Sequence, residues 1–297
     1  MFEIKIKYPE KFNIDCTLDC GQTFRWKKSG NVWKGVVKDI ALILEDENGC
    51  LKVNSSKNSL FEMGLNEGLR YYFGFDDNLD KIHEFIRDMS EKFSERTRKI
   101  SLKALKDGEG IRILRQDPFE MTVEYIISSR NSIVNIRNTA DRISSFFEQN
   151  RVILSGEEFY KFPTYDQFKS LTEKNFRDLR TAFRAKYLAK LAETVETEAF
   201  FKKLHAMNEI DIIEELIKIK GIGYKVASCI ALFGYGKLNC FPVDIWIIRA
   251  MKDLFDIEGN TTKIMERGME MFSPYAGYFQ EVLFRYYRLN YVKEIKK

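Results

Sequence analysis

Histidine is the scarcest ionisable residue in this chain of 297 residues, with only His83 and His205. Mechanisms and metal sites that need several imidazoles are therefore disfavoured. Cysteine is also sparse. The five cysteines are an odd number scattered along the chain, which indicates a reducing cytoplasm and not a disulfide framework.

Long hydrophobic runs and a large net charge are missing too. The longest apolar run, around Val226–Phe233, is far too short to span a membrane, and Met1–Lys7 lacks the pattern of a signal peptide. We therefore expect a cytoplasmic protein without membrane contact. The 48 Lys+Arg and 44 Asp+Glu residues leave a net charge of +4, which permits a nucleic-acid partner but excludes a histone-like protein.

The composition is that of a globular protein, with 44% hydrophobic and 31% charged residues. The length suggests about two domains. Short apolar or alternating runs at Phe24–Trp26, Val32–Val37 and Ile40–Leu44 predict strands, and turn signals at Lys28–Asn31 and Asp46–Gly49 separate them. These runs predict an antiparallel sheet.

Helical periodicity begins near Asn78 and dominates the rest of the chain, and no convincing strand follows residue 101. We therefore predict an α+β protein, with an antiparallel β-rich domain over residues 1–104 and a helical body over residues 105–297. Within the body, the predicted helices are 118–130, 134–150, 166–172, 175–182, 185–204, 209–217, 224–233, 244–255, 260–271 and 275–288.

The segment Leu216–Cys229 is the most informative part of the chain. It predicts a helix, a tight turn at Gly221-Ile-Gly223 and a second helix. Glycine permits positive φ and close approach of a ligand, and the amides that begin a helix bind phosphate independently of base sequence. A Gly-x-Gly turn alone is equally typical of an ordinary helix corner.

Lys225 falls in the first turn of the second helix, and Cys229 lies four residues on, on the same face. Asp244 follows Pro242 at the head of another apolar helix, where it is a good N-cap. Taken singly, Lys225 is typical of a solvated helix lysine and Asp244 of a plain cap. The joint pattern is more specific than either residue.

That pattern resembles the helix-hairpin-helix DNA glycosylase superfamily (HhH-GPD), and a lysine at position 225 looks like its bifunctional branch, which combines glycosylase with AP lyase. Five further segments resemble the 8-oxoguanine DNA glycosylases in the same order along the chain: Cys20–Trp26, Gly110–Pro118, Ile126–Asn131, Phe183–Tyr187 and Pro274–Phe284.

The resemblance implies that a damaged nucleotide is flipped out of the duplex into a pocket. Lys225 would then attack C1′, or trap the sugar after base loss, and form a Schiff base. The amine must be uncharged to attack, so burial or cationic neighbours must favour its neutral form. Asp244 would stabilise positive charge developing on the sugar.

The resemblance also implies how the lesion is recognised. In 8-oxoguanine N7 is a donor, so a backbone carbonyl at Gly21 would attract the lesion and repel guanine. Phe284 and Cys229 would contact opposite faces of the base, and Gln280 would read its Watson–Crick edge. Without the resemblance, Gly21 is typical of a turn, Phe284 of a core aromatic and Gln280 of a boundary residue.

The remaining implied contacts bind the duplex. Gly221 and Gly223 would bind phosphate, and Phe183 would act as a wedge. Several positions depart from the family pattern. Arg130, followed by Asn131, stands where an Asn commonly fills the space of the flipped base, and Asn135 replaces an Arg that reads the opposite cytosine; a second such Arg is retained as Arg184. Since each good base contact contributes ~1–3 kcal/mol of discrimination, we predict a relaxed preference for cytosine opposite the lesion.

We expect no cofactor. The last cysteine is Cys240, so the superfamily's iron–sulfur cluster is not expected, and Cys16 and Cys20 have no second pair that would complete a zinc site. The expected partner is double-stranded DNA containing oxidised guanine, bound by a monomer in the cytoplasm, or at the nucleoid if the source is prokaryotic. The basic run 285–297 is more typical of a solvated helix end than of a phosphate site.

Two other functions remain open from the sequence. A monofunctional alkylpurine DNA glycosylase of the same superfamily would rely on the aspartate and water and would lack the lysine. A non-catalytic helix-hairpin-helix DNA-binding protein would use only the phosphate contacts.

Overall fold

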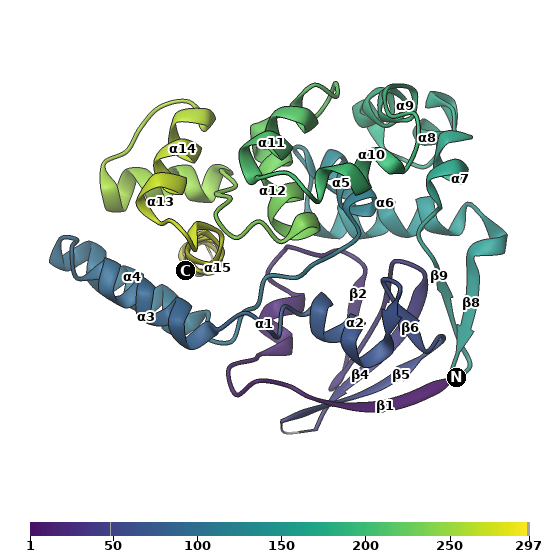
Figure 1. Ribbon diagram of the computed structural model, residues 1–297. Coiled ribbons are helices and arrows are strands. Elements are labelled where there is room, and N and C mark those ends of the chain that lie inside the picture. Colours follow the sequence, from purple (N-terminus) through teal and green to yellow (C-terminus); the bar gives the residue numbers. More distant parts are fainter. Residues whose placement is uncertain (48, 296–297) are drawn as a thin grey trace.

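The computed structural model describes residues 1–47 and 49–295, with side chains through residue 290. A sheet lies at one end of the molecule, and a larger body of helices covers it (Figure 1). None of the helices in the described residues is long and apolar enough to cross a membrane.

The N-terminal sheet has five strands in the order β1-β5-β4-β3-β2, and every neighbouring pair is antiparallel. The predicted antiparallel sheet is therefore confirmed. Its inward side chains form a separate core with helix α2, in which Trp26 Nε1–H donates to the Tyr72 hydroxyl over 2.7 Å. The strands are β1 (Phe2–Lys7), β2 (Trp26–Ser29), β3 (Val32–Val37), β4 (Ile40–Asp46) and β5 (Cys50–Ser55), and a small second pair is β6 (Ser59–Leu60) and β7 (Met63–Gly64).

The helices fill most of the remaining chain. They are α1 (Ile14–Leu18), α2 (Leu65–Tyr72), α3 (Leu79–Ser90), α4 (Glu95–Asp107), α5 (Pro118–Ser128), α6 (Ile133–Ser145), α7 (Tyr165–Lys169), α8 (Glu173–Asp178), α9 (Ala185–Thr194), α10 (Ala199–Leu204), α11 (Glu209–Ile217), α12 (Tyr224–Tyr235), α13 (Ile245–Phe255), α14 (Thr261–Met271) and α15 (Ala276–Ile295).

The prediction that no strand follows residue 101 is wrong. Strands β8 (Arg151–Leu154) and β9 (Glu157–Tyr160) form a hairpin whose apolar side packs on the N-terminal sheet. The two-residue turn between them, Ser155-Gly156, has positive φ at both positions, as a tight hairpin requires. The missed signal is therefore a Ser-Gly turn between two short apolar runs.

Other differences concern helix limits. The segment predicted as one helix over 134–150 ends at Ser145 and is followed by a 3-10 turn, and the segment 185–204 is broken between α9 and α10. Helix α2 has no counterpart in the prediction, although Leu65, Leu69 and Tyr72 give it a buried face at helical spacing.

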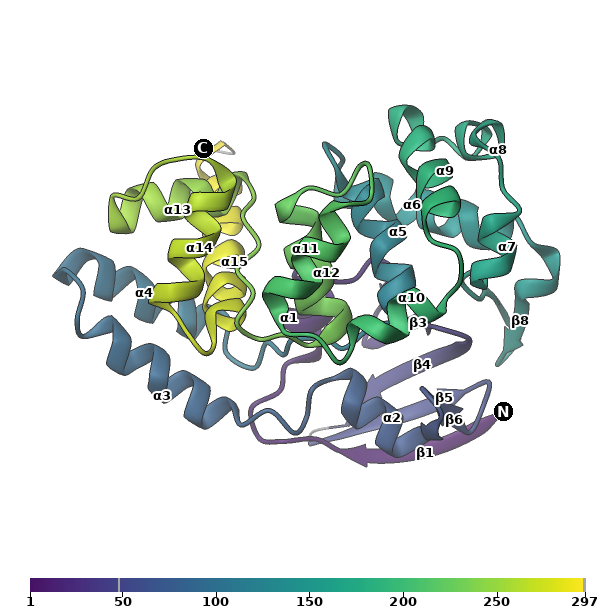
Figure 2. The same cartoon turned by 45° about the horizontal axis from the view of Figure 1, so that its top comes forward.

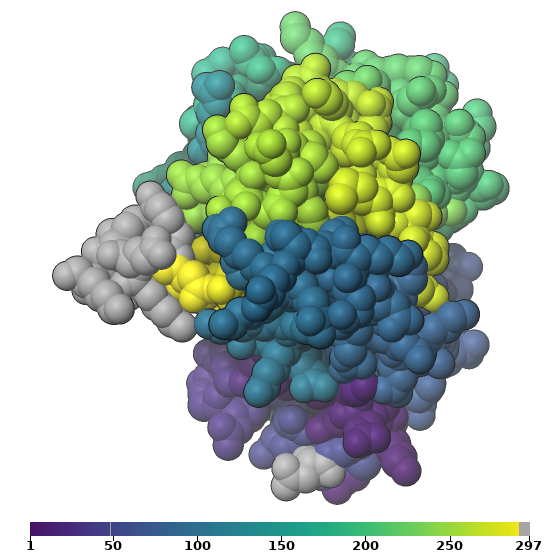
Figure 3. All heavy atoms as spheres, turned by 90° about the vertical axis from the view of Figure 1, so that its left-hand side faces the viewer, coloured from purple at the N-terminus to yellow at the C-terminus, as the bar shows by residue number. Residues whose placement is uncertain are grey.

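The helical core brings together segments from both halves of the sequence. Residues 79–104 fall in the predicted first domain, yet buried side chains of α3 and α4 join the core of the helical body. Figure 3 shows α3 and α4 lying between the sheet and the C-terminal helices. In Figure 2, α11 and α12 lie between α13–α15 on one side and α5–α10 on the other.

The buried amide of Gln22 joins the two parts of the molecule. Its Nε2 donates to the carbonyls of Thr17 (3.0 Å) and Arg112 (2.8 Å), and its Oε1 accepts the amide of Leu114 (2.8 Å). Its own carbonyl accepts from Gln116 over 2.7 Å. These bonds fix the turn before β2 against the strand-like segment that leads into α5.

Replacing this amide should therefore destabilise the whole protein. Gln22→Leu would leave buried carbonyls and an amide without partners, and we expect the free energy of unfolding to fall by about 3 kcal/mol, as measured by urea denaturation. Gln149→Leu, at an exposed position, should change it by less than about 0.5 kcal/mol. Equal effects of the two substitutions would contradict the proposed link.

Candidate active site

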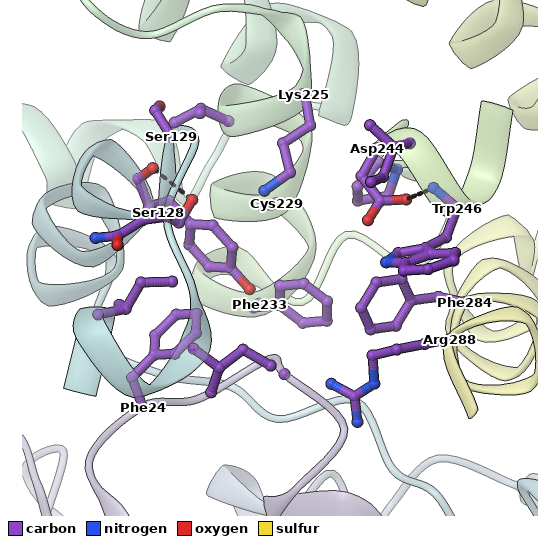
Figure 4. A pocket seen from close by; sticks show the side chains of 18 of the residues that line it. Phe24, Ser128, Ser129, Lys225, Cys229, Phe233, Asp244, Trp246, Phe284 and Arg288 are labelled. Atoms are coloured by element: carbon purple, nitrogen blue, oxygen red, sulfur yellow. Dashed lines mark hydrogen bonds between the residues drawn. The ribbon is translucent and has the colours of Figure 1, made fainter. Parts of the chain in front are cut away.

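A cavity of about 460 Å³ opens where the helical body meets the turn before β2. Its walls come from α5, α6, α12, α13, α15 and that turn, so segments more than 250 residues apart in sequence line one cavity. In Figure 4, Lys225 extends into this space from α12, and Asp244, Trp246 and Phe284 lie across from it. The volume is within the ~300–1,000 Å³ typical of small-ligand pockets.

Lys225 is placed by the helix–turn–helix of α11 and α12. Gly221 has φ +105°, and a Cβ there would lie 2.5 Å from Cγ of Tyr187, so the turn needs glycine for both its backbone and its packing. Helix α12 begins after Gly223 without a side-chain cap, which leaves its first-turn amides available for an anion. Lys225 is the second residue of that helix.

The surroundings of Lys225 are largely apolar. Its Nζ lies 5.1 Å from the centre of the Tyr125 ring, and Cys229 lies on the next turn of the helix. Burial raises the pKa of the Cys229 thiol to about 11, so the sulfur is an uncharged neighbour at neutral pH. Among the described residues, no carboxylate pairs with Lys225 within 4 Å.

Asp244 is the N-cap of α13, as the sequence predicts. Its carboxylate accepts the amides of Trp246 and Ile247, each over 3.0 Å. Burial raises the pKa of Asp244, while those amides and the positive charge of Lys225 oppose the rise. The cap thus fixes a carboxylate on the cavity wall.

The far wall contains Gly21, Gln280 and Phe284. Gly21 has φ +109°, and a Cβ on it would point at the Phe284 ring (3.6 Å) and at the guanidinium of Arg288 (3.5 Å). Gln280 is 4% exposed, and within the described part of the chain its Oε1 has no hydrogen-bond partner. The wall therefore offers a bare backbone, an aromatic ring and an unsatisfied amide oxygen.

A second, shallower depression adjoins the cavity at the loop after α5. It is lined by Arg130, Phe183, Gly221 and Gly223, and Arg130 borders the main cavity as well, with Asn131. Phe183 is 44% exposed, which is unusual for a phenylalanine. The structure thus gathers the predicted wedge, loop and hairpin on one surface.

Two of the predicted residues line neither depression. Asn135 is exposed in the first turn of α6. Arg184 is only 6% exposed, and its guanidinium donates to the carbonyls of Ser129 (2.8 Å) and Arg130 (2.9 Å) and, more weakly, to Thr181 (3.4 Å). The structure places Arg184 as a support of the loop, and its contact with an opposite base stays a prediction.

Sequence reasoning missed two cavity residues on α15. Arg288, assigned above to a solvated helix end, lines the cavity with its guanidinium 5.3 Å from the centre of the Phe284 ring, and it donates to the Asp19 carbonyl over 3.0 Å. Glu281 lines the same cavity. Arg288 follows Phe284 by four residues and Glu281 by seven, and this helical spacing could have indicated that all three lie on one face of α15. The rest of the predicted basic run, the side chains of residues 291–297, lies outside the described part.

Comparison with known proteins agrees with this geometry. Residues 5–122 match the family model of the 8-oxoguanine DNA glycosylase N-terminal domain, and residues 123–274 match that of the HhH-GPD superfamily base excision DNA repair proteins. The apo-form crystal structure of the Clostridium acetobutylicum 8-oxoguanine glycosylase/lyase is 30% identical, with a TM-score of 0.83 over 96% of each chain. The chain belongs to the 8-oxoguanine DNA glycosylases of the HhH-GPD superfamily.

Further relatives of this glycosylase support the assignment. The same Clostridium enzyme in complex with double-stranded DNA containing cytosine opposite 8-oxoguanine is 30% identical, with a TM-score of 0.81 over 96% of this chain and 98% of that chain. The N-glycosylase/DNA lyase OGG1 of Arabidopsis thaliana is 28% identical over 95% of this chain and 79% of that protein. The resemblance inferred from the sequence is confirmed.

The bonds of Arg184 predict a specific effect on the loop after α5. Arg184→Met should leave the Ser129 and Arg130 carbonyls without a donor, so amide hydrogen exchange across residues 129–132 should become at least about tenfold faster. Lys186→Met, an exposed change in the first turn of α9, should leave that exchange unchanged. Unaltered protection in Arg184→Met would show that the loop does not depend on the guanidinium.

Proposed function

We propose that this protein excises 8-oxoguanine from double-stranded DNA and then cuts the damaged strand by β-elimination through a Schiff base at Lys225. The observation that carries the proposal is the placement of Lys225 and Asp244 on facing walls of one cavity, beside a surface suited to a distorted duplex. The family assignment supports the same reaction.

The chemistry follows from the positions of these two groups. The neutral amine of Lys225 attacks C1′ as the bond from C1′ to the base breaks, and the base leaves with the bonding electron pair. The Asp244 carboxylate, held by two amides, stabilises the positive charge that develops on the sugar. The nitrogen loses a proton to the departing base, and the sugar ring then opens as the C1′–O4′ bond breaks, O4′ takes up a proton, and a protonated imine forms between Lys225 and C1′. This imine acidifies C2′–H, and loss of that proton expels the 3′-phosphate group and breaks the strand.

The surroundings of the amine leave it available to a substrate. Lys225 lies against Tyr125 and an uncharged thiol, and among the described residues no carboxylate pairs with it within 4 Å. No ion pair with a described residue therefore has to be broken before the amine attacks.

The far wall supports a flipped purine as the substrate. The Gly21 carbonyl would accept N7–H, which 8-oxoguanine has and guanine lacks. Phe284 and Cys229 would contact the two faces of the base, and the unsatisfied Oε1 of Gln280 would accept from its Watson–Crick edge. All four of these residues line the cavity.

The adjoining surface supports binding to a duplex in which one nucleotide is flipped out. The open amides after Gly223 would bind a phosphate, the exposed ring of Phe183 would wedge between bases, and Arg130 with Asn131 would occupy the vacated space. A monofunctional glycosylase would not need Lys225 in the cavity, and a protein that only binds DNA would not need the cavity.

Borohydride trapping tests the central step. Incubation with an 8-oxoguanine duplex and borohydride should yield a covalent complex of one protein with the damaged strand, and Lys225→Gln should abolish it because Lys225 is the only lysine among the described residues that line the cavity. Lys220→Gln, on the exposed side of the hairpin, should still be trapped. Base loss without trapping or strand cleavage would instead support the monofunctional alternative.

The surroundings of Asn135 and Arg184 predict weak selection of the opposite base. Single-turnover excision of 8-oxoguanine opposite C, A, G and T should differ by no more than about tenfold, because one arginine is replaced and the other is bonded to the loop. Asn135→Arg should raise the preference for cytosine, whereas Asn138→Arg, three residues further along α6, should not. A preference of the unmodified protein above about 100-fold would contradict the prediction.

A further inference from the structure

Glu281 resembles the neighbouring Gln280, which is proposed above to contact the base, in its burial and in its unpaired side-chain oxygen. Gln280 and Glu281 are consecutive on α15, are 4% and 3% exposed, and both line the cavity. In each of them Oε1 is buried and has no hydrogen-bond partner within the described residues. Since buried polar atoms are nearly always bonded, an unsatisfied oxygen on a cavity wall points to a missing ligand.

Within the described part of the chain, no ion pair or strong hydrogen bond accounts for a carboxyl group at this position. The carboxyl group contacts the thiol of Cys20, a weak hydrogen-bonding group. The two nearby guanidinium groups are bonded elsewhere, Arg285 to the Asp107 carbonyl (3.4 Å) and Arg288 to the Asp19 carbonyl (3.0 Å). An apolar side chain would fill this space at lower cost, so the carboxyl group has a use other than packing.

The contact with Cys20 places the carboxyl group beside the turn that lines the cavity. Cys20 directly precedes Gly21, so Glu281 borders the same turn whose carbonyl is proposed to accept N7–H. On an oxidised guanine, the atom next to N7 is C8, which carries the new oxygen O8. The edge that distinguishes the lesion from guanine therefore faces the part of the wall that Glu281 occupies.

We propose that Glu281, in its protonated form, donates a hydrogen bond to O8 of the flipped 8-oxoguanine. This inference rests on the function proposed above and adds a second reader of the lesion to Gly21. Guanine carries C8–H at this place and cannot accept the bond, so the contact favours the damaged base. An ionised Glu281 would instead repel O8, because both atoms are then acceptors.

The electrostatic environment supports a neutral carboxyl group. Burial raises the pKa of Glu281 to about 7, and Asp244 adds to the rise, while the Cys20 thiol, Arg288 and Arg285 oppose it. From the other walls, Cys229 and Tyr125 face the carboxyl group, and burial keeps both uncharged at neutral pH. Because the protonated form is the donor, recognition should be complete below the raised pKa and lost as the pH rises through it.

The test is the pH dependence of lesion binding by protein that carries Lys225→Gln, so that no strand is cut. Dissociation constants would be measured between about pH 5.5 and pH 8.5 for duplexes with 8-oxoguanine, with guanine and with a tetrahydrofuran abasic analogue. The preference for 8-oxoguanine over the abasic duplex should fall about tenfold over this range, the effect of losing one to two hydrogen bonds.

Two substitutions of Glu281 separate the proposal from a structural role. Glu281→Met should remove the pH dependence and give weak 8-oxoguanine binding at every pH, with guanine and abasic binding unchanged. Glu281→Gln, whose amide donates at any pH, should restore lesion binding and make it independent of pH. Glu124→Gln, which changes another fully buried and unpartnered carboxyl group outside the cavity, should keep the pH dependence of the parent.

Several outcomes would overturn the proposal. Equal losses for all three duplexes in Glu281→Met, with a lower melting temperature, would show a structural role. A pH-independent preference in the parent, or an unchanged preference in Glu281→Met, would show that O8 is not read by this group. Nicking of the 8-oxoguanine duplex by the unmodified protein is measured in parallel, because its absence would mean that the proposed function itself fails.

Discussion

The position of one turn, Cys20-Gly21-Gln22, controls the rest of the active site. The buried Gln22 amide bonds this turn to the segment leading into α5, and those bonds hold the N-terminal part against the helical body. Gly21 is thereby placed against Phe284 of α15, although 263 positions separate them in the chain. The cavity lies between the N-terminal part and the helical body, so its rigidity depends on the bonds that join them. The fully hydrogen-bonded side chain of Gln22 supplies such bonds.

Two helix termini place Lys225 and Asp244 on the cavity walls. The uncapped start of α12 brings Lys225 and open amides to the rim, and the capped start of α13 brings the Asp244 carboxylate to the opposite wall. Both termini are fixed by backbone bonds and packing and do not depend on flexible surface side chains. In the function proposed above, this arrangement would keep Lys225 and Asp244 oriented before a substrate arrives and so lower the cost of reaching the transition state.

Two of the unsatisfied buried oxygens belong to residues of the cavity wall, where the proposed contacts with the base would use them. Gln280 and Glu281 leave Oε1 atoms without partners on the cavity wall. Such atoms cost about 1–3 kcal/mol each in the free protein and recover that energy only when a ligand with complementary donors or acceptors enters. Arg184 shows the opposite case, because its donors are already used within the loop that the duplex would meet.

The sequence by itself determined the antiparallel sheet, most helices of the body and the helix–turn–helix with Lys225, because these depend on local periodicity, caps and glycine turns. It did not reveal the β8–β9 hairpin, the break between α9 and α10, or the joining of α3 and α4 to the helical core. Only the tertiary structure decided that Glu281 and Arg288 line the cavity and that Arg184 is buried. Those facts depend on which distant segments meet, and burial and unsatisfied bonds exist only after they have met.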